Sequence, residues 1–281
     1  MGSFRSIPKK LVLSSAFIAL ALGFATSSSR LQKAPITIAD NNMVIALPKF
    51  MQIILAGGDR YLAANITTFR ALVSNVSSSK DDRLSVQAKI QSDAAWLNPF
   101  HEDNYYLAAA TLPWSGLVDQ AQYILQSASE ARSFDMLPPF FYAFNQYYFE
   151  HDPLGGSDWL KIAASHTNEL DQKLALEKLA ARWIEKSHDH HQALKMLEIM
   201  ASQSKNKSIR ENVLLRAERV RHLISLDEAS STYMKTYNTR PFSIDDLTKS
   251  GILKQLPRDP LGDGYILDQY GKAQFKSKAM K

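Results

Sequence analysis

The stretch from Asp103 to Ala128 most constrains the fold, because it reads as two short helices joined by a turn at Pro113–Gly116. Small residues stand where these helices must approach each other closely, at Ala108, Ala109, Ala121 and Ala128. Neither helix is long enough to be stable alone, since most helical stability in proteins comes from packing an apolar face. The pair is therefore expected to pack against similar pairs.

Helical patterns with short breaks continue on both sides of this stretch, and almost nothing before Arg240 reads as a strand. The residue before a proline is pushed out of the helical region, so Asn98 ends one helix. The predicted class is all-α. The expected helices cover Phe50–Ala56, Tyr61–Val73, Leu84–Leu97, Glu102–Leu112, Leu117–Ala131, Pro138–Glu150, Ser157–His166, Asp171–Lys186, His190–Gln203 and Ile209–Tyr237.

The N-terminus has the pattern of an export signal. Residues 1–10 are basic, and Leu11–Ala25 is an apolar run without charge. Fifteen residues suit the apolar region of a signal peptide better than a membrane-spanning helix, which needs about 20. Residues 1–28 are predicted to be either a signal peptide cut after Ala25 or an uncleaved membrane anchor. Residues 29–47 are then a tether, and the body of the protein lies in the periplasm or on the periplasmic face of the inner membrane.

Charge and cysteine content exclude several functions. The net charge is +5, but three of the basic residues lie within residues 1–29, which contain no acid. The rest of the chain carries nearly equal numbers of basic and acidic residues, so nucleic acid is not an expected partner. The chain has no cysteine, which excludes disulfides, thiol catalysis and cysteine-based zinc sites.

Residues 240–281 differ in character from the helical body and are predicted to form a C-terminal clasp. Ser243 and Asp246 match a capping box at the start of a short helix that Gly251 ends. Tyr265–Asp268 and Ala273–Lys276 are expected to pair as a small β-hairpin. We expect this segment to pack on the last helices.

The placing of small and bulky residues repeats along the helical body. Ala109 and Ala143 are 34 residues apart, and so are Trp159 and Ala193. This pattern resembles the tetratricopeptide repeat, a helix–turn–helix unit of about 34 residues. With Glu102 as the first position of a unit, the family's characteristic positions are filled by Tyr105, Ala109, Gly116, Ala121, Leu125 and Ala128, and in a later unit by Ala181 and Ala193.

The resemblance covers roughly residues 93–203 of a helical-repeat domain at 48–239. It implies a right-handed superhelix of stacked hairpins. The middle unit departs from the pattern, because it needs about four extra residues at Asp152–Gly156 and has Trp159 where the family has a small side chain. The terminal proline of the family is also missing. Another kind of α-α superhelix remains an alternative.

In this family the first helix of each unit lines a groove that binds peptides or protein segments. At the matching positions of this chain, the resemblance implies a protein-binding groove. Its residues would be Asp103, Tyr106, Ala110, Trp114, Phe140, Gln146 and Tyr147. The aromatic residues of 140–149 lie on both faces of their predicted helix, so packing between helices is the competing interpretation for them.

The C-terminal segment carries a second resemblance. Leu256, Pro257, Asp259, Pro260, Gly262 and Tyr265 are similar to the C-terminal element of type II secretion pseudopilins. In these proteins an acidic residue follows the prepilin cleavage site, but this chain has Ser28 at that position. Its apolar run also lies before the site and not after it. A subunit of a filament or secretion machine is therefore a second alternative. Asp259, Asp263 and Asp268 would be candidate calcium ligands.

The best chemical candidate is the cluster His188–His191, which contains three histidines. Histidine is the commonest metal ligand, but these residues lie in a turn before a helix, where Asp189 is expected to act as an N-cap. A histidine-dependent metal-binding or hydrolytic protein is the first alternative. Because no nucleophile or phosphate-binding motif is found, we predict no enzyme, no catalytic residue, no metal and no cofactor.

The sequence thus predicts a non-catalytic scaffold or assembly factor for protein–protein interaction in the bacterial envelope. Its expected partners are another envelope protein or a peptide segment, with the membrane contacted through the N-terminal segment. The oligomeric state does not follow from the sequence.

Overall fold

The computed structural model describes residues 17–28, 46–74, 81–262 and 264–276. Contacts divide the chain into two units, Met1–Val44 and Ile45–Lys281. In the first unit, residues 17–28 are helical, and the other residues of the predicted signal or anchor and nearly all of the tether lie outside the described residues. Over the part of the chain that the structure describes, no helix combines the length and apolar character needed to cross a membrane.

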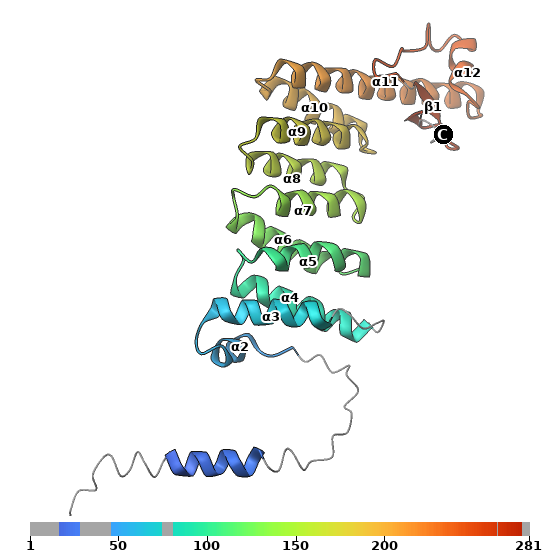
Figure 1. The fold of residues 1–281 in the computed structure, drawn as a ribbon. Helices are drawn as coiled ribbons and strands as arrows, with labels where there is room; N and C mark the ends of the chain where they lie inside the picture. Colours follow the sequence, from blue (N-terminus) through green and yellow to red (C-terminus); the bar gives the residue numbers. More distant parts are fainter. Residues whose placement is uncertain (1–16, 29–45, 75–80, 263, 277–281) are drawn as a thin grey trace, which may run out of the picture. The chain divides into compact units, whose positions relative to one another are not determined.

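The second unit is mostly helical, and consecutive helices lie side by side (Figure 1). Because each connection is short, neighbouring helices run antiparallel. The helices are α2 Lys49–Leu55, α3 Arg60–Ser74, α4 Asp81–Leu97, α5 Glu102–Thr111, η1 Pro113–Ser115, α6 Val118–Ala131, α7 Leu137–Tyr148, α8 Pro153–Ser165, α9 Leu170–Glu185, α10 His190–Gln203, α11 Lys207–Tyr237 and α12 Ile244–Lys249.

The ends of these helices follow from particular residues. Asp152, Asp189 and Asn206 accept backbone N–H bonds at the starts of α8, α10 and α11, as N-caps do. The predicted cap at Asp189 is therefore confirmed. Gly116 ends η1 with φ +79°, the left-handed conformation that a residue with a Cβ rarely adopts. Residues 75–80, between α3 and α4, lie outside the described residues.

One predicted boundary is wrong. Helix α8 starts at Pro153 and not at Ser157, so the residues expected as an insertion are helical. Gly156 is buried, and a Cβ built on it would lie 3.0 Å from the Ala143 carbonyl oxygen and 3.1 Å from the Trp183 ring. Glycine is needed here because α8 passes closer to its neighbours than a larger residue allows.

The hydrophobic core is a chain of small clusters, each shared by a few neighbouring helices. Tyr105, Ile124 and Leu125 centre one of them between α4 and α7. Leu160 and Trp183 centre the next, and Leu197 and Val213 the one after it. Many of the remaining core residues are alanines, and these small side chains let the helices approach closely.

The last cluster joins α11 to the C-terminal clasp, residues 240–281. Strands β1 Tyr265–Leu267 and β2 Ala273–Phe275 pair antiparallel, with Ile266 opposite Gln274. The predicted hairpin and the capping box at Ser243 and Asp246 are both present. The cluster packs Leu223, Leu226 and Ala229 of α11 against Leu247 and Ala273.

Candidate functional site

Aromatic side chains gather where η1 meets the C-terminal end of α7. The Trp114 ring lies 5.0 Å from Phe149 and 5.6 Å from Tyr148, measured between ring centroids. Tyr148 in turn stacks on Phe144 at 5.4 Å, with the two rings almost parallel. Trp114 and Tyr148 are exposed in spite of these contacts. Large aromatic rings that remain accessible are typical of sites that bind other proteins.

The backbone beneath this cluster is held by buried groups. Pro113 and Leu112 are buried, and the Leu117 N–H donates to the Leu112 carbonyl at 3.0 Å, which closes the turn that carries Trp114. On the other side, buried Asn145 donates to Gln122 Oε1 at 3.3 Å. Gln122 donates to the Tyr142 carbonyl at 3.3 Å. These bonds join α6 to α7, so the aromatic rings are presented on a rigid base.

Carboxylates border the aromatic cluster. Asp119 lies in the first turn of α6, while Glu150 and Asp152 follow α7, and all three are exposed. Partial burial, followed by the negative charges of Asp119 and Asp152, raises the pKa of Glu150. We call Trp114, Phe144, Tyr148 and Phe149 together with Asp119, Glu150 and Asp152 the aromatic–acidic face. Such a surface attracts cations electrostatically and offers ring faces for cation–π contact.

The structure places the residues of the predicted groove in different environments. Asp103, Tyr106, Ala110 and Trp114 are exposed on α5 and η1. Phe140 is half-buried and packs in the cluster between α7 and α9. Tyr147 stacks on Trp183 at 4.4 Å and accepts a hydrogen bond from Lys186. Gln146 is half-buried, and its backbone carbonyl oxygen accepts a hydrogen bond from the backbone N–H of Asp152.

Tyr106 is next to a second, smaller aromatic group. Its ring stacks on Tyr105 at 4.6 Å and meets Phe141 edge-on at 6.0 Å. Tyr105 is buried and donates to Asp135 at 2.7 Å, which fixes the start of α7 beside α5. Tyr106 is thus an exposed aromatic residue of α5 that packs on Phe141, whereas Phe140 and Tyr147 pack between the helices.

Sequence reasoning missed Tyr148 and Phe149 as partners of Trp114. The signal was present, since Tyr148 stands 34 residues after Trp114. The resemblance to the tetratricopeptide repeat implies that equivalent positions of successive units lie side by side, and it would have predicted this contact. No sequence pattern predicts the carboxylates beside the aromatic cluster, because Asp119 and Glu150 come together only through the packing of α6 against α7.

The histidine cluster lines a pocket of about 750 Å³ beside α11. His190 Nδ1 lies 3.2 Å from Asp227 Oδ2, and the other oxygen of Asp227 accepts the Ala273 N–H at 2.7 Å. His188 and His191 are exposed. Within the described residues, no three His, Cys, Asp or Glu side chains converge in a way that would hold a metal ion. The His190–Asp227 contact joins α10, α11 and β2.

A second pocket, of about 540 Å³, lies where α9 and α11 meet β2. Buried Glu185 sits within it between Arg216 and Arg219, and the distance from Arg219 Nη1 to Glu185 Oε1 is 2.6 Å. Arg219 Nε also lies 2.7 Å from Asp259 Oδ1. The carboxylate of Asp259, a candidate calcium ligand, is thus paired with an arginine, and Asp263 lies outside the described residues.

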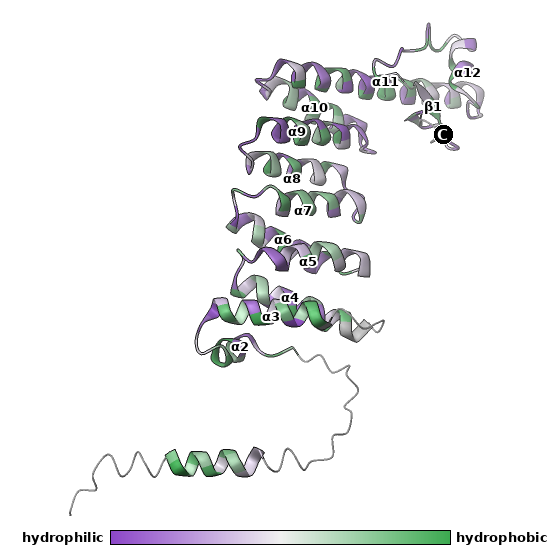
Figure 2. Ribbon diagram, in the orientation of Figure 1, coloured by the Kyte–Doolittle hydropathy of each residue, from purple (hydrophilic) through white to green (hydrophobic). Residues whose placement is uncertain are grey.

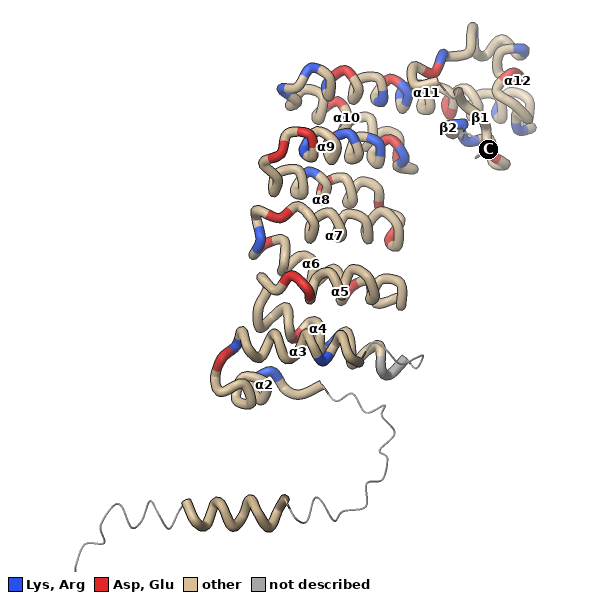
Figure 3. The backbone as a smooth tube through the Cα atoms, viewed as in Figure 1, with Lys and Arg blue, Asp and Glu red and all other residues tan. Residues whose placement is uncertain are grey.

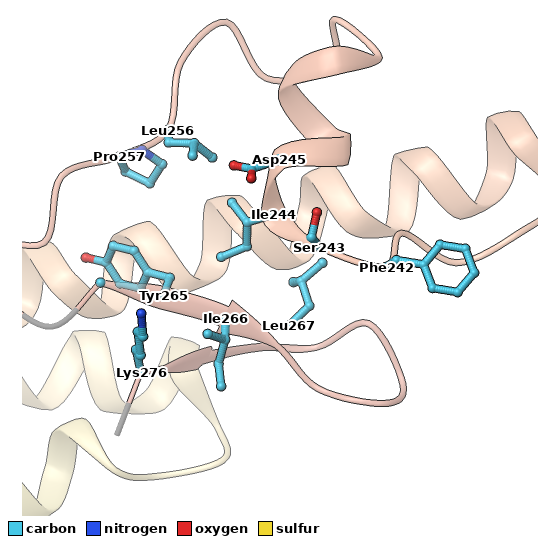
Figure 4. A pocket seen from close by; sticks show the side chains of 11 residues that line it. Phe242, Ser243, Ile244, Asp245, Leu256, Pro257, Tyr265, Ile266, Leu267 and Lys276 are labelled. Atoms are coloured by element: carbon cyan, nitrogen blue, oxygen red, sulfur yellow. The ribbon is translucent and has the colours of Figure 1, made fainter. Parts of the chain in front are cut away.

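A third pocket, of about 480 Å³, opens inside the clasp. Figure 4 shows Ile244 of α12 facing Tyr265 of β1 and Asp245 turned toward Leu256, while Ile266 points to the other side of the strand. These three pockets all involve the clasp or its junction with the helices, and the aromatic–acidic face lies in a separate part of the unit.

Comparison of the chain with known proteins places it in no family. It matches no protein-family model, and neither the curated proteins nor the solved structures give a match.

Proposed function

We propose that this protein is a non-catalytic scaffold that binds a segment of another envelope protein. In this proposal the N-terminal segment directs the chain to the envelope and tethers it to the membrane. The stacked hairpins of the second unit, arranged as a right-handed superhelix of the tetratricopeptide type, present the binding surface. The export pattern and the repeat spacing of the sequence support these two parts.

The observation that carries the proposal is the aromatic–acidic face. Trp and Tyr dominate the energetic centres of protein interfaces because they remove much apolar area from water at a low entropic cost. Here an exposed Trp114 and Tyr148 lie beside three exposed carboxylates. The chemistry that fits them is an extended or helical segment carrying apolar side chains next to Lys or Arg.

The test is affinity purification of the full chain from membranes after crosslinking in cells. A double variant, Trp114→Ala with Tyr148→Ala, is compared with Tyr123→Ala, which removes an exposed tyrosine of α6 outside the face. Loss of two interface anchors at about 2 kcal/mol each corresponds to at least a hundredfold loss of affinity.

We expect one partner to be recovered in a fixed ratio with the wild-type chain and the Tyr123 variant and to disappear with the double variant. Its crosslinked segment should contain basic and apolar residues. Equal recovery with all three chains would contradict the assignment of this face.

A further inference from the structure

The first two helices of the second unit expose an unusual apolar surface. We call it the N-terminal apolar face. On α2 it comprises Phe50, Met51, Ile54 and Leu55, and on α3 it comprises Tyr61, Leu62, Ile66, Phe69, Leu72 and Val73. The exposed fractions of these ten side chains run from 36% to 68%. Figure 2 shows the hydrophobic residues of α2 and α3 in green.

In an ordinary amphipathic helix the large apolar side chains are buried, whereas in α3 they are exposed. The buried side of α3, which packs against α4 and also contacts α2, consists of small residues, namely Ala63, Ala64, Thr67, Thr68 and Ala71. The large apolar residues Leu62, Ile66, Phe69 and Val73 follow the helical spacing of three and four but point to the outside. In stacked helical proteins the terminal element needs a polar outer side to stay soluble. The two helices at this end of the unit, α2 and α3, lack one.

The size of the face matches one half of a protein interface. With about 200 Å² for a large side chain, the ten residues expose on the order of 1,000 Å². The largest apolar patch on a typical monomer is only about 300–600 Å². A stable interface buries about 800 Å² on each partner. The exposed area therefore exceeds what a single copy ordinarily carries and is sufficient for a stable dimer.

The charges around the face are already engaged within the chain. Lys49 lies 3.8 Å from Asp93 and 4.8 Å from the Trp96 ring. Arg60 donates to the carbonyl oxygens of Trp96 and Leu97, and Asp59 accepts the backbone N–H groups that start α3. Charged residues are sparser over α2 and α3 than from α9 to α11 (Figure 3). Binding to an anionic membrane relies on Lys and Arg side chains, and Lys49 and Arg60 already have partners within the chain.

We propose that the N-terminal apolar face binds the same face of a second copy of this chain. A two-fold interface places one patch against itself, so a uniformly apolar surface is complementary to its own copy. A different partner would be selected by unmatched charges at the rim, and Lys49, Asp59 and Arg60 are engaged elsewhere. In the dimer, α3 packs along α3 of the partner.

Single-cysteine crosslinking tests this interface directly, because the natural chain contains no cysteine. The full chain is purified in a mild detergent as four variants with one cysteine each, at Leu62, Ile66, Phe69 or Val73. Leu214→Cys is the matched control, since Leu214 is an exposed leucine on α11. A short bis-maleimide joins two cysteines that face each other near the two-fold axis.

We expect a product of twice the chain mass from at least one α3 position and none from Leu214→Cys. In sedimentation, Phe69→Glu should raise the dissociation constant of the dimer at least a hundredfold, because it introduces two charges into one interface. Leu214→Glu should leave the dissociation constant unchanged.

Three outcomes would overturn the proposal. The first is the absence of a crosslink at all four α3 positions, and the second is an equal yield from Leu214→Cys. The third is a monomer that binds phosphatidylcholine vesicles and loses this binding with Phe69→Glu, which would assign the face to a lipid surface.

Discussion

Helices α3 and α11 each pack against several neighbouring elements, but their remaining surfaces are built differently. The outer side of α3 carries exposed Leu62, Ile66 and Phe69, whereas α11 exposes mainly charged residues such as Arg210, Glu211 and Arg221. The C-terminal half of α11 is also covered by the clasp. One end of the helical unit is thus closed within the chain, and the other is left with an apolar surface for contact with another molecule.

The closure at α11 uses polar contacts as well as apolar ones. Ser230 donates to the Gly271 carbonyl at 2.7 Å, and His222 Nδ1 lies 2.9 Å from the Tyr265 hydroxyl. Asp227 accepts from Ala273, and Arg219 pairs with Asp259. Each contact needs a particular side chain at a particular place, so the clasp has one arrangement. The N-terminal apolar face does not need such polar contacts, because the burial of apolar surface area alone favours its binding.

The largest effect is expected at the buried charges. Arg219→Ala leaves Glu185 and Asp259 buried with fewer compensating charges, which costs about 3–5 kcal/mol of unfolding free energy. Arg221→Ala removes only an exposed pair with Glu198 and should cost less than about 1 kcal/mol. Urea unfolding of the two variants measures both values. Equal losses would show that the buried network does not close the C-terminal end.

Asp227 should make the closure depend on pH. Burial alone would raise the pKa of Asp227, but hydrogen bonds with His190 and the Ala273 N–H lower it below its ordinary value of 3.8. A lowered pKa stabilises the fold above pH 3.8, and this stability is lost as the pH falls through the lower folded value.

Asp227→Asn should therefore unfold more easily at pH 6 by about 1.5–3 kcal/mol, the range for a hydrogen bond to a charged group. The difference from wild type should shrink toward zero as the pH approaches the folded pKa. A difference that is constant over the whole acid range would exclude a contribution from the Asp227 charge.

Gly271 tests how closely the clasp approaches α11. Its φ is +78°, and a Cβ built on it would lie 3.1 Å from Ser230 Oγ. Gly116 has nearly the same φ, with no atom within 4 Å of a built Cβ. Both substitutions to alanine carry the conformational cost, about 1–3 kcal/mol. Thermal unfolding should show a larger loss of stability for Gly271→Ala than for Gly116→Ala. Equal losses of stability would mean that the clasp moves aside to make room for the added methyl group.

The smallest effect is expected at the N-terminal apolar face of the separated copies. Ile66→Ala removes a side chain that is already exposed, so at protein concentrations below the dimer dissociation constant it should change the unfolding free energy by less than about 0.5 kcal/mol. Leu226→Ala, in the cluster under the clasp, should cost about 2–5 kcal/mol. A cost at Ile66 as large as that at Leu226 would mean that the side chain packs within its own copy.

The sequence predicts the helices well where the signals are local. Apolar spacing, Pro99 and the caps at Asp189 and Ser243 mark most elements within a few residues. The start of α8 was misplaced, because Gly155-Gly156 has the local character of a loop and only the contacts of Gly156 with Ala143 and Trp183 explain a helix there. Tertiary packing decides such positions.

The surfaces that we propose for binding were harder to predict for the same reason. The resemblance to the tetratricopeptide repeat implies a binding position at Trp114, but the acidic residues around Trp114 depend on how α6 packs against α7. The spacing of Leu62, Ile66 and Phe69 predicts a helix without showing which side faces the core. The large residues are ordinarily the buried ones, and here the alanines and threonines of α3 take that place.

Hydrogen–deuterium exchange of the full chain at two protein concentrations tests the difference between the two ends most directly. If the N-terminal face joins two copies, amide protection in α2 and α3 falls on dilution below the dimer dissociation constant. Protection in α11 and the clasp stays the same, because their contacts lie within one chain. Exchange of α3 that is independent of concentration, and equal in wild type and Phe69→Glu, would contradict the account.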